Sequence, residues 1–237
     1  MSDSDYAFSD TQINASIKSQ VESVTLISQR RGQFVKTAIK LFRHNGYHST
    51  TIKQIAKAAG VSPGLIYQYV TDKEDILFLA LQYIVHAYKT VLPEAIGRVE
   101  DPLHKFMTAF EEYCRVLDKN RDASVLTYIE TRTLSPERRE ALKQMELEVN
   151  DLMAQPLRDS INAGLLEQIN VDLVVTSAAV IVHSWALKHW HLKEVVNLEE
   201  FIRFYHTSLL SGLWRKSKLN HSGSAVGQLL IRSRILI

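Results

Sequence analysis

Apolar residues recur along most of the chain at spacings of three and four, which is the period of one face of an α-helix. In residues 28–45, Phe34, Ala38 and Leu41 fall at i, i+4 and i+7, and Gly46 follows where a C-cap glycine belongs. Strand-like alternation of apolar and polar residues between turn pairs is missing from the sequence. The pattern predicts an all-α protein of about nine helices without an internal repeat.

Two short helices are expected directly after residue 50. Thr51 and Gln54 have the spacing of a capping box, and the helix they begin is expected to stop at Gly60. Ser62 can cap the next helix, with Pro63 at its first position, where a missing N–H costs nothing. This arrangement is typical of a helix-turn-helix, in which a glycine permits the turn and the second helix enters the major groove of DNA.

Longer helices are expected in the rest of the chain. Thr71 and Glu74 are spaced as a second capping box, and Pro93 is expected to end the helix that this box begins, because proline lacks the N–H that continues a helix. The expected ranges are residues 72–92, 101–118, 122–133, 136–163, 171–191 and 198–216.

The chain is therefore expected to have four parts. A Ser-rich mobile arm covers residues 1–27, and a three-helix DNA-binding domain covers residues 28–75. A larger helical domain for ligand binding and dimerisation covers residues 76–217, and a tail of unknown role covers residues 218–237.

The second short helix carries side chains suited to reading DNA. It begins with the small residues 62–64, which let the backbone approach DNA closely. Leu65 can touch a thymine methyl group, and Gln68 can pair with adenine. The hydroxyls of Tyr67 and Tyr69 can bind phosphates, or both rings can pack between helices. Because the two tyrosines are two positions apart and point to different sides, we expect at least one to reach DNA.

A set of positions over about 45 residues matches one known family at once: Ala38, Leu41, Phe42, Gly46, Tyr47, Thr50, Thr51, Ile52, Ile55, Ala56, residues 59–64, residues 66–69, Lys73 and Glu74. Together they closely resemble the DNA-binding domain of the TetR family of bacterial transcriptional regulators. The chain departs from the family pattern at Val70, usually aromatic, and at Leu65, often a small hydroxyl residue. The departure at Leu65 puts the identity of one read base in doubt.

The resemblance implies which residues meet DNA. It places Lys73 on a phosphate, which would explain a cation at a helix N-terminus, where the helix dipole disfavours it by about 0.3–1 kcal/mol. It places Thr51 and Lys53 near the DNA backbone or a base edge. The full set of expected DNA contacts is Thr51, Lys53, Ser62, Pro63, Gly64, Leu65, Tyr67, Gln68, Tyr69 and Lys73.

The resemblance also implies a homodimer and a small-molecule effector. Helices 171–191 and 198–216 are expected to pair across a two-fold axis as a four-helix bundle, so that two recognition helices read a palindromic operator. The intervening helices are expected to enclose a pocket whose ligand spreads the recognition helices and releases the repressor from double-stranded DNA.

Ten residues are candidates to line that pocket, although most would simply be core residues if no pocket exists. Arg132 is available for an anion, so the aromatic and aliphatic set favours a small hydrophobic effector with a polar end, such as an acyl-CoA. The candidates are Phe106, Phe110, Tyr113, Leu117, Tyr128, Arg132, Met145, Val149, His183 and Trp190.

Charge is distributed unevenly along the chain. There are 28 Lys and Arg against 26 Asp and Glu, a net charge of +2. Between Arg30 and Thr71, however, there are seven basic residues and no acidic one, which leaves −5 on the other 195 residues. Residues 72–214 carry −7, and the tail from Arg215 carries +5. A basic block is by itself as often a solvated face as a partner site, but beside a helix-turn-helix it favours DNA contact.

Other classes of protein fit the sequence poorly. The single Cys114 permits no intramolecular disulfide or cysteine-based zinc cluster, and the acidic start is not a secretory signal. His183, His189 and His191 lack the spacing of metal ligands. With no membrane span, nucleophile motif, phosphate loop or paired carboxylate evident, we expect a cytoplasmic protein without cofactor, metal or enzymatic activity, associated with the nucleoid when bound to DNA.

Two other functions stay open at this point. The same DNA-binding domain could serve an architectural or cell-cycle protein that has no small-molecule effector. Alternatively, the chain could be an all-α ligand-binding protein whose motif no longer binds DNA.

Overall fold

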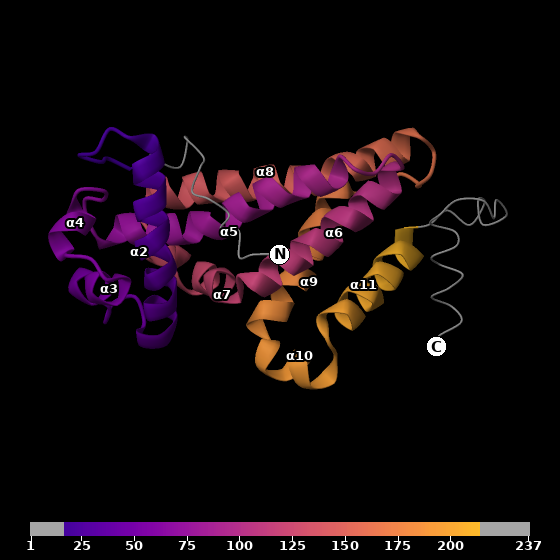
Figure 1. The fold of residues 1–237 in the computed structure, drawn as a ribbon. Coiled ribbons are helices and arrows are strands. Elements are labelled where there is room, and N and C mark those ends of the chain that lie inside the picture. Colours follow the sequence, from indigo (N-terminus) through magenta and orange to yellow (C-terminus); the bar gives the residue numbers. More distant parts are fainter. Residues whose placement is uncertain (1–16, 214–237) are drawn as a thin grey trace. The chain divides into compact units, whose positions relative to one another are not determined.

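The computed structural model describes residues 17–213, and all regular elements in that range are helices (Figure 1). This confirms the predicted all-α fold. The elements are α2 (Val24–Asn45), α3 (Ile52–Ala59), α4 (Pro63–Tyr67), α5 (Lys73–Ile96), α6 (Pro102–Lys119), α7 (Arg121–Glu130), the 3-10 turn η1 (Thr131–Thr133), α8 (Pro136–Asn162), α9 (Val171–Leu187), α10 (His189–Val195) and α11 (Leu198–Leu213).

These helices form two compact units. The first contains residues 17–90 and Lys119–Leu147, and the second contains Val91–Asp118 and residues 148–213. The boundary expected between residues 75 and 76 falls inside α5, which continues without a break. Residues 1–16 of the expected arm and the whole expected tail, residues 218–237, lie outside the described residues.

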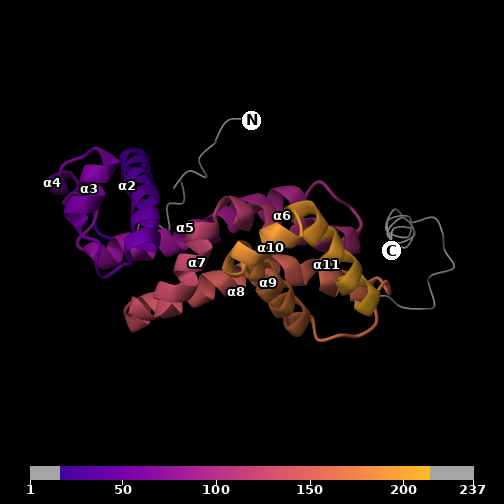
Figure 2. The same cartoon turned by 90° about the horizontal axis from the view of Figure 1, so that it is seen from below.

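In the first unit, α2, α3 and α4 group at the N-terminal end of α5 (Figures 1 and 2). The helix α2 packs against both α3 and α7. Its apolar face is buried as the spacing predicted, with Phe34 and Phe42 at most 3% exposed and Ala38 fully buried. Complete burial of one such aromatic side chain contributes on the order of 2 kcal/mol, so this face fixes α2 in the unit.

The helix α2 begins four residues earlier than predicted. Ser23 is its N-cap and accepts a hydrogen bond from the backbone N–H of Leu26 at 3.4 Å. Ile27 is buried, and Ile17, still further upstream, is only 3% exposed. Residues 17–27, expected to belong to a mobile arm, are therefore packed on the first unit.

Both predicted ends of the helix now labelled α5 need correction. Pro93 lies inside the helix, which continues to Ile96, so the lost backbone donor does not end it. At the other end, Asp72 rather than Thr71 supplies the cap, and its carboxylate accepts from the N–H of Asp75 at 2.8 Å. A carboxylate is a stronger acceptor for this donor than a threonine hydroxyl.

The helix α5 is long, apolar and mostly buried. By length and composition it could cross a membrane, and so could the bent pair of α9 and α10 taken as one span. In α5, however, 72% of the most apolar 18-residue window is buried inside the protein. Such burial is what a helix surrounded by other helices requires.

In the second unit, the segment predicted as one helix over residues 171–191 is broken. The helix α9 ends at Leu187, and α10 starts at His189 at 90° to it. Tertiary contacts rather than a glycine or proline hold this bend: the indole N–H of Trp185 donates to Asp118 at 2.8 Å, and its ring lies 5.0 Å from that of Phe201. Local sequence therefore gave no sign of the break.

Candidate nucleic-acid interface

The turn between α3 and α4 has the predicted backbone geometry. Thr51 and Gln54 form both bonds of the capping box at the start of α3. Gly60 ends α3 with φ of 70°, the left-handed conformation that glycine adopts without strain. Ser62 caps α4 by accepting from the N–H of Leu65 at 3.1 Å. These bonds set α4 as a separate, short helix directly after the turn.

Most of the expected DNA contacts lie on accessible surface. The side chain of Tyr67 is 49% exposed, and Thr51, Lys53, Ser62, Gly64 and Gln68 are also exposed. Pro63 and Leu65 are half-buried. On α4 itself, Ile66 is fully buried and anchors the helix to the core. The recognition helix thus has one face held in the protein and one face open.

Tyr69 does not belong to that open face. Its side chain is 3% exposed, and its ring centroid lies 6.5 Å from that of Phe34 on α2. Of the two tyrosines, therefore, only Tyr67 presents its side chain to solvent, and the predicted DNA contact of Tyr69 is wrong. The departure at Val70 is explained by packing, since that residue is 1% exposed.

Lys73 has partners inside the protein that the sequence did not reveal. Its ammonium group donates to the carbonyl oxygens of Tyr47 and Thr50, both at 3.0 Å, and to that of His48 at 3.3 Å. It also lies 4.3 Å from the ring centroid of Tyr47. An ammonium has three N–H donors, and these carbonyls use all three. These hydrogen bonds hold the loop before α3, so they explain the lysine at this helix N-terminus without a phosphate.

Part of the basic block is likewise engaged within the first unit. Arg31 is fully buried and bonds to backbone carbonyls, and Arg43 lies 3.6 Å from the carboxylate of Asp122. Lys40, Lys53 and Lys57 are exposed. The net charge of the block therefore overstates the number of cations that face outward.

One ion-pair cluster in the first unit was not predicted from the sequence. Arg138 on α8 pairs with Glu74 at 3.3 Å and with Asp75, and Glu74 also accepts from the N–H of Ser135 at 2.9 Å. Asp75 is 2% exposed and accepts from the N–H of Thr71 at 2.6 Å. These contacts tie α8 to the first turn of α5, directly after the helix-turn-helix. Partners more than 60 positions apart give no local sequence signal.

The ten pocket candidates are divided between the two units. The apolar residues Phe106, Phe110, Leu117 and Val149 are at most 2% exposed and belong to the second unit, as do Tyr113, His183 and Trp190. Tyr128, Arg132 and Met145 belong to the first unit, where Tyr128 is 50% exposed and Arg132 is exposed.

Two polar candidates meet in the second unit. The hydroxyl of Tyr113 lies 2.9 Å from Nε2 of His183, and their rings are 5.7 Å apart. Burial lowers the pKa of His183 to about 4, because the imidazolium would lose its hydration. His183 is therefore neutral at neutral pH and acts as a hydrogen-bonding group without charge.

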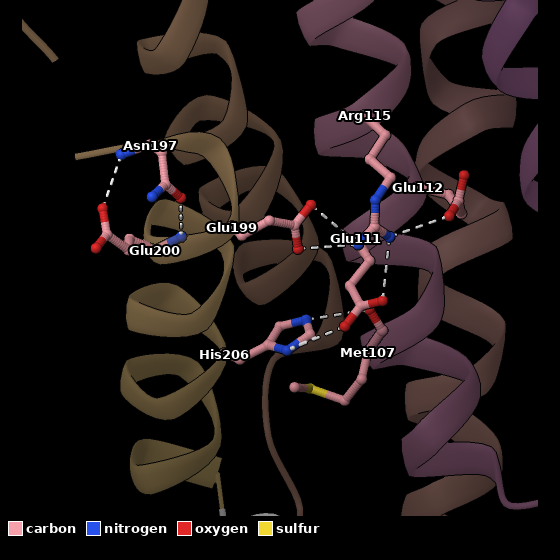
Figure 3. Close-up of polar contacts among 8 residues, drawn as sticks. All are labelled: Met107, Glu111, Glu112, Arg115, Asn197, Glu199, Glu200 and His206. Carbon is pink, nitrogen blue, oxygen red and sulfur yellow. Dashed lines mark hydrogen bonds and ion pairs between the residues drawn. The ribbon is translucent and has the colours of Figure 1, made fainter. Parts of the chain in front are cut away.

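A second polar cluster joins α6 to α11 (Figure 3). The guanidinium of Arg115 pairs with the carboxylates of Glu111, Glu112 and Glu199 at 3.1–3.3 Å. His206 on α11 bonds through Nε2 to the carbonyl oxygen of Met107 at 3.2 Å, and burial lowers its pKa despite the nearby charge of Glu111. These contacts fix one side of α11.

One face of α9 is apolar and exposed, and α11 adds one exposed aromatic side chain, Phe204, turned away from His206. Leu173, Val180 and Leu187 on α9 are seven positions apart, and they are 63%, 57% and 37% exposed. The side chain of Phe204 on α11 is 63% exposed, and that of Trp190 on α10 is 71% exposed. A spacing of seven places residues on one stripe of a helix, and large apolar side chains in such a stripe are typical of an interface.

The described residues contain no group of three or more His, Cys, Asp or Glu side chains that could hold a metal ion. Cys114 is fully buried, and its burial raises the pKa of the thiol above its usual range. A thiol in that setting is unreactive.

An N-terminal helix-turn-helix with an open recognition face, followed by a larger helical region, defines a DNA-binding transcriptional regulator. Residues 34–80 match the family described as "Bacterial regulatory proteins, tetR family", and residues 99–194 match "Tetracyclin repressor-like, C-terminal domain". The chain is 38% identical over 187 residues to the HTH-type transcriptional regulator HbdR of Aromatoleum sp. (strain CIB), covering 79% of this chain and 82% of that protein. The chain belongs to the TetR family, as its motifs indicated.

Other relatives agree with this assignment. The Fatty acid metabolism regulator protein of Bacillus subtilis (strain 168) is 27% identical over 143 residues, 57% of this chain and 70% of that protein. Two solved structures share the fold. PfmR from Thermus thermophilus has a TM-score of 0.67 at 24% identity, covering 77% of this chain and 99% of that one. KstR2 of Mycobacterium tuberculosis has a TM-score of 0.66 at 19% identity, covering 84% and 100%.

Proposed function

We propose that this regulator is a homodimeric repressor that binds a palindromic operator and is released by a small hydrophobic effector. The observation that carries the proposal is the open face of α4, with Tyr67 and Gln68 exposed behind a rigid turn. One five-residue helix spans only a few base pairs, so useful specificity requires two copies on two half-sites.

The stripe of Leu173, Val180 and Leu187 supports a second copy of this chain as the dimer partner. Together with Phe204, it offers apolar side chains on two long helices, which is the composition of a homodimer interface. Thr176 and Ser177 lie exposed between Leu173 and Val180 and are small enough for a partner helix to approach closely.

Within α3 and α4, we propose DNA contacts through Thr51, Lys53, Ser62, Pro63, Gly64, Leu65, Tyr67 and Gln68. Lys73 acts on DNA binding through the loop it closes, because its carbonyl partners Tyr47, His48 and Thr50 precede the capping residue of α3. Its role is to place the start of α3.

The effector is proposed to be an acyl thioester or a similar hydrophobic molecule with a polar end. Regulators of fatty acid metabolism and a ketosteroid transcriptional regulator, by their names, are among the relatives and structural neighbours. Tyr113, which is buried, and His183, which is half-buried, can supply neutral hydrogen bonds among apolar residues of α6, such as Phe106 and Phe110. Thermal-shift measurements with a set of acyl-CoAs test this assignment, and no stabilisation by any of them would remove it.

The operator proposal is tested with the DNA upstream of the protein's own coding sequence. A gel shift is expected to show specific binding by two subunits, reversed by the effector. Binding to many unrelated sites without reversal would instead favour the architectural alternative. We further propose that the protein acts in the cytoplasm, on the nucleoid, and catalyses no reaction.

A further inference from the structure

The segment before α2 is attached to the end of the recognition helix. The backbone N–H of Gln20 donates to the carbonyl oxygen of Gln68 at 2.8 Å, and the hydroxyl of Ser19 donates to the same oxygen at 3.1 Å. Gln68 is the C-cap residue of α4. Upstream of these bonds, Ile17 is buried. The chain from Ile17 to Gln20 is thus held against α4 by both polar and apolar contacts.

Arg31 on α2 fastens this segment from inside the protein. Its Nη2 atom donates to the carbonyl oxygens of Ile17 and Tyr69, both at 2.8 Å, and its Nε atom donates to Tyr69 at 3.1 Å. The side chain is fully buried, and a buried guanidinium without partners would be very unfavourable. One side chain therefore links the upstream segment to the residue that follows Gln68.

We infer that residues 17–20 belong to the DNA-binding surface and that Lys18 binds a phosphate of the duplex next to those approached by α4. Lys18 is exposed and lies between the buried Ile17 and the hydrogen-bonded Ser19. The inference rests on the proposed entry of α4 into the major groove. Arg31 is a positioning residue in this arrangement, because it holds the segment and does not itself reach solvent.

Charge and placement support phosphate as the partner. The exposed side chains of Tyr67 and Gln68 are expected to face DNA, and the neighbour of Lys18 is bonded directly to Gln68. A DNA strand that passes Gln68 therefore comes within reach of a flexible lysine. The segment precedes residue 34, where the match to the family's DNA-binding domain begins.

The inference is tested by the salt dependence of DNA binding. Fluorescence anisotropy with the protein's own upstream DNA is measured over a range of salt concentrations for the wild type, Lys18→Gln and the control Lys119→Gln. Lys119 is an exposed lysine at the end of α6, so its substitution makes the same charge change outside the helix-turn-helix. One lost phosphate contact reduces the slope of log K against log salt by about 0.9, or roughly 1.8 for a dimer.

We expect this reduction for Lys18→Gln, with on the order of tenfold weaker binding per subunit at 0.1 M salt. The control is expected to retain the slope of the wild type. A slope for Lys18→Gln equal to that of the control would overturn the inference while leaving the proposed function intact. Failure of the wild type to bind any upstream DNA would instead contradict the proposed function.

The positioning role of Arg31 has its own readout. Arg31→Met is expected to reduce the salt slope as Lys18→Gln does, although Lys18 is still present, because the segment is released. Ile17→Ser removes the apolar contact of the segment and changes no helical residue. It is the alternative variant for the same measurement if Arg31→Met does not fold. Adding Lys18→Gln to either variant should cause no further change of slope. A variant with normal slope and only a lower melting temperature would show that the attachment is structural and overturn this role.

Discussion

Arg138 on the first turn of α8 forms an ion pair with Asp75 on the first turn of α5, 63 positions earlier in the sequence. The side chain of Asp75 is 3% exposed and that of Arg138 is 25% exposed. The pair thus connects a buried charge beside the helix-turn-helix to a helix from the other half of the chain.

Removing the cation of this pair should destabilise the first unit. Arg138→Leu leaves the buried carboxylate of Asp75 without its ion-pair partner, and we expect a loss of about 2–4 kcal/mol in the free energy of unfolding. Urea denaturation measures the change. The control Lys143→Leu removes a pair with Glu140 in which both side chains are about 60% exposed, and it should cost less than about 1 kcal/mol. Equal losses in the two variants would contradict a buried role for Asp75.

The stability of the protein should fall in mild acid because of His183. The pKa of this group is about 4 in the folded protein, against an ordinary value of 6.5. Between these two pKa values, His183 takes up a proton in the unfolded chain but stays neutral in the folded protein. The free energy of unfolding therefore decreases as pH falls from 6.5 to about 4. Over that range the wild type should lose up to about 3 kcal/mol relative to His183→Gln, as measured by urea denaturation at several pH values. Parallel pH curves for the two proteins would disprove a buried neutral His183.

Lys73 should affect DNA binding without acting as a phosphate contact. In Lys73→Met, three carbonyl oxygens lose their donor, so the loop before Thr51 is expected to loosen and DNA affinity to fall. Because no phosphate contact is lost, the slope of log K against log salt should match that of the wild type. A slope reduced by about 0.9 per subunit would favour direct phosphate binding, as the family resemblance implies.

The exposed stripe on α9 should control the oligomeric state. Val180→Glu places a charge in the centre of the proposed interface, and burial of an unpaired carboxylate in a dimer is strongly unfavourable. We expect a monomer by sedimentation velocity and a large loss of operator affinity. Leu147→Glu is the matched control, since Leu147 is also 57% exposed but lies in the first unit. Dimers of Val180→Glu with normal stability would exclude this face as the interface.

Local sequence signals predicted the elements that depend on local bonds. The capping box of Thr51 and Gln54, the left-handed Gly60 and the cap at Ser62 all involve atoms within four residues of one another. The periodicity also placed Phe34 and Ala38 on the buried face of α2. The recognition surface could be anticipated because it follows directly from that turn.

The remaining features depend on partners distant in sequence. The ring of Tyr69 packs against that of Phe34 on α2. The ammonium group of Lys73 donates hydrogen bonds to carbonyl oxygens in the loop Tyr47–Thr50. The bend after Leu187 is likewise fixed by packing around Trp185 rather than by a breaker residue. In each case, spacing along the chain carries no information on which tertiary partner is present.

The central claim, that the open face of α4 reads operator DNA in a dimer, is tested most directly by measuring the affinity of the protein for its own upstream DNA as a function of salt. The wild type should bind with a steep negative dependence on salt concentration, and Gln68→Ala should weaken specific binding without changing the slope. Salt-independent binding by the wild type would contradict the account. So would a Gln68→Ala variant that prefers the upstream DNA over unrelated DNA as strongly as the wild type does, or a wild type that binds both DNAs equally.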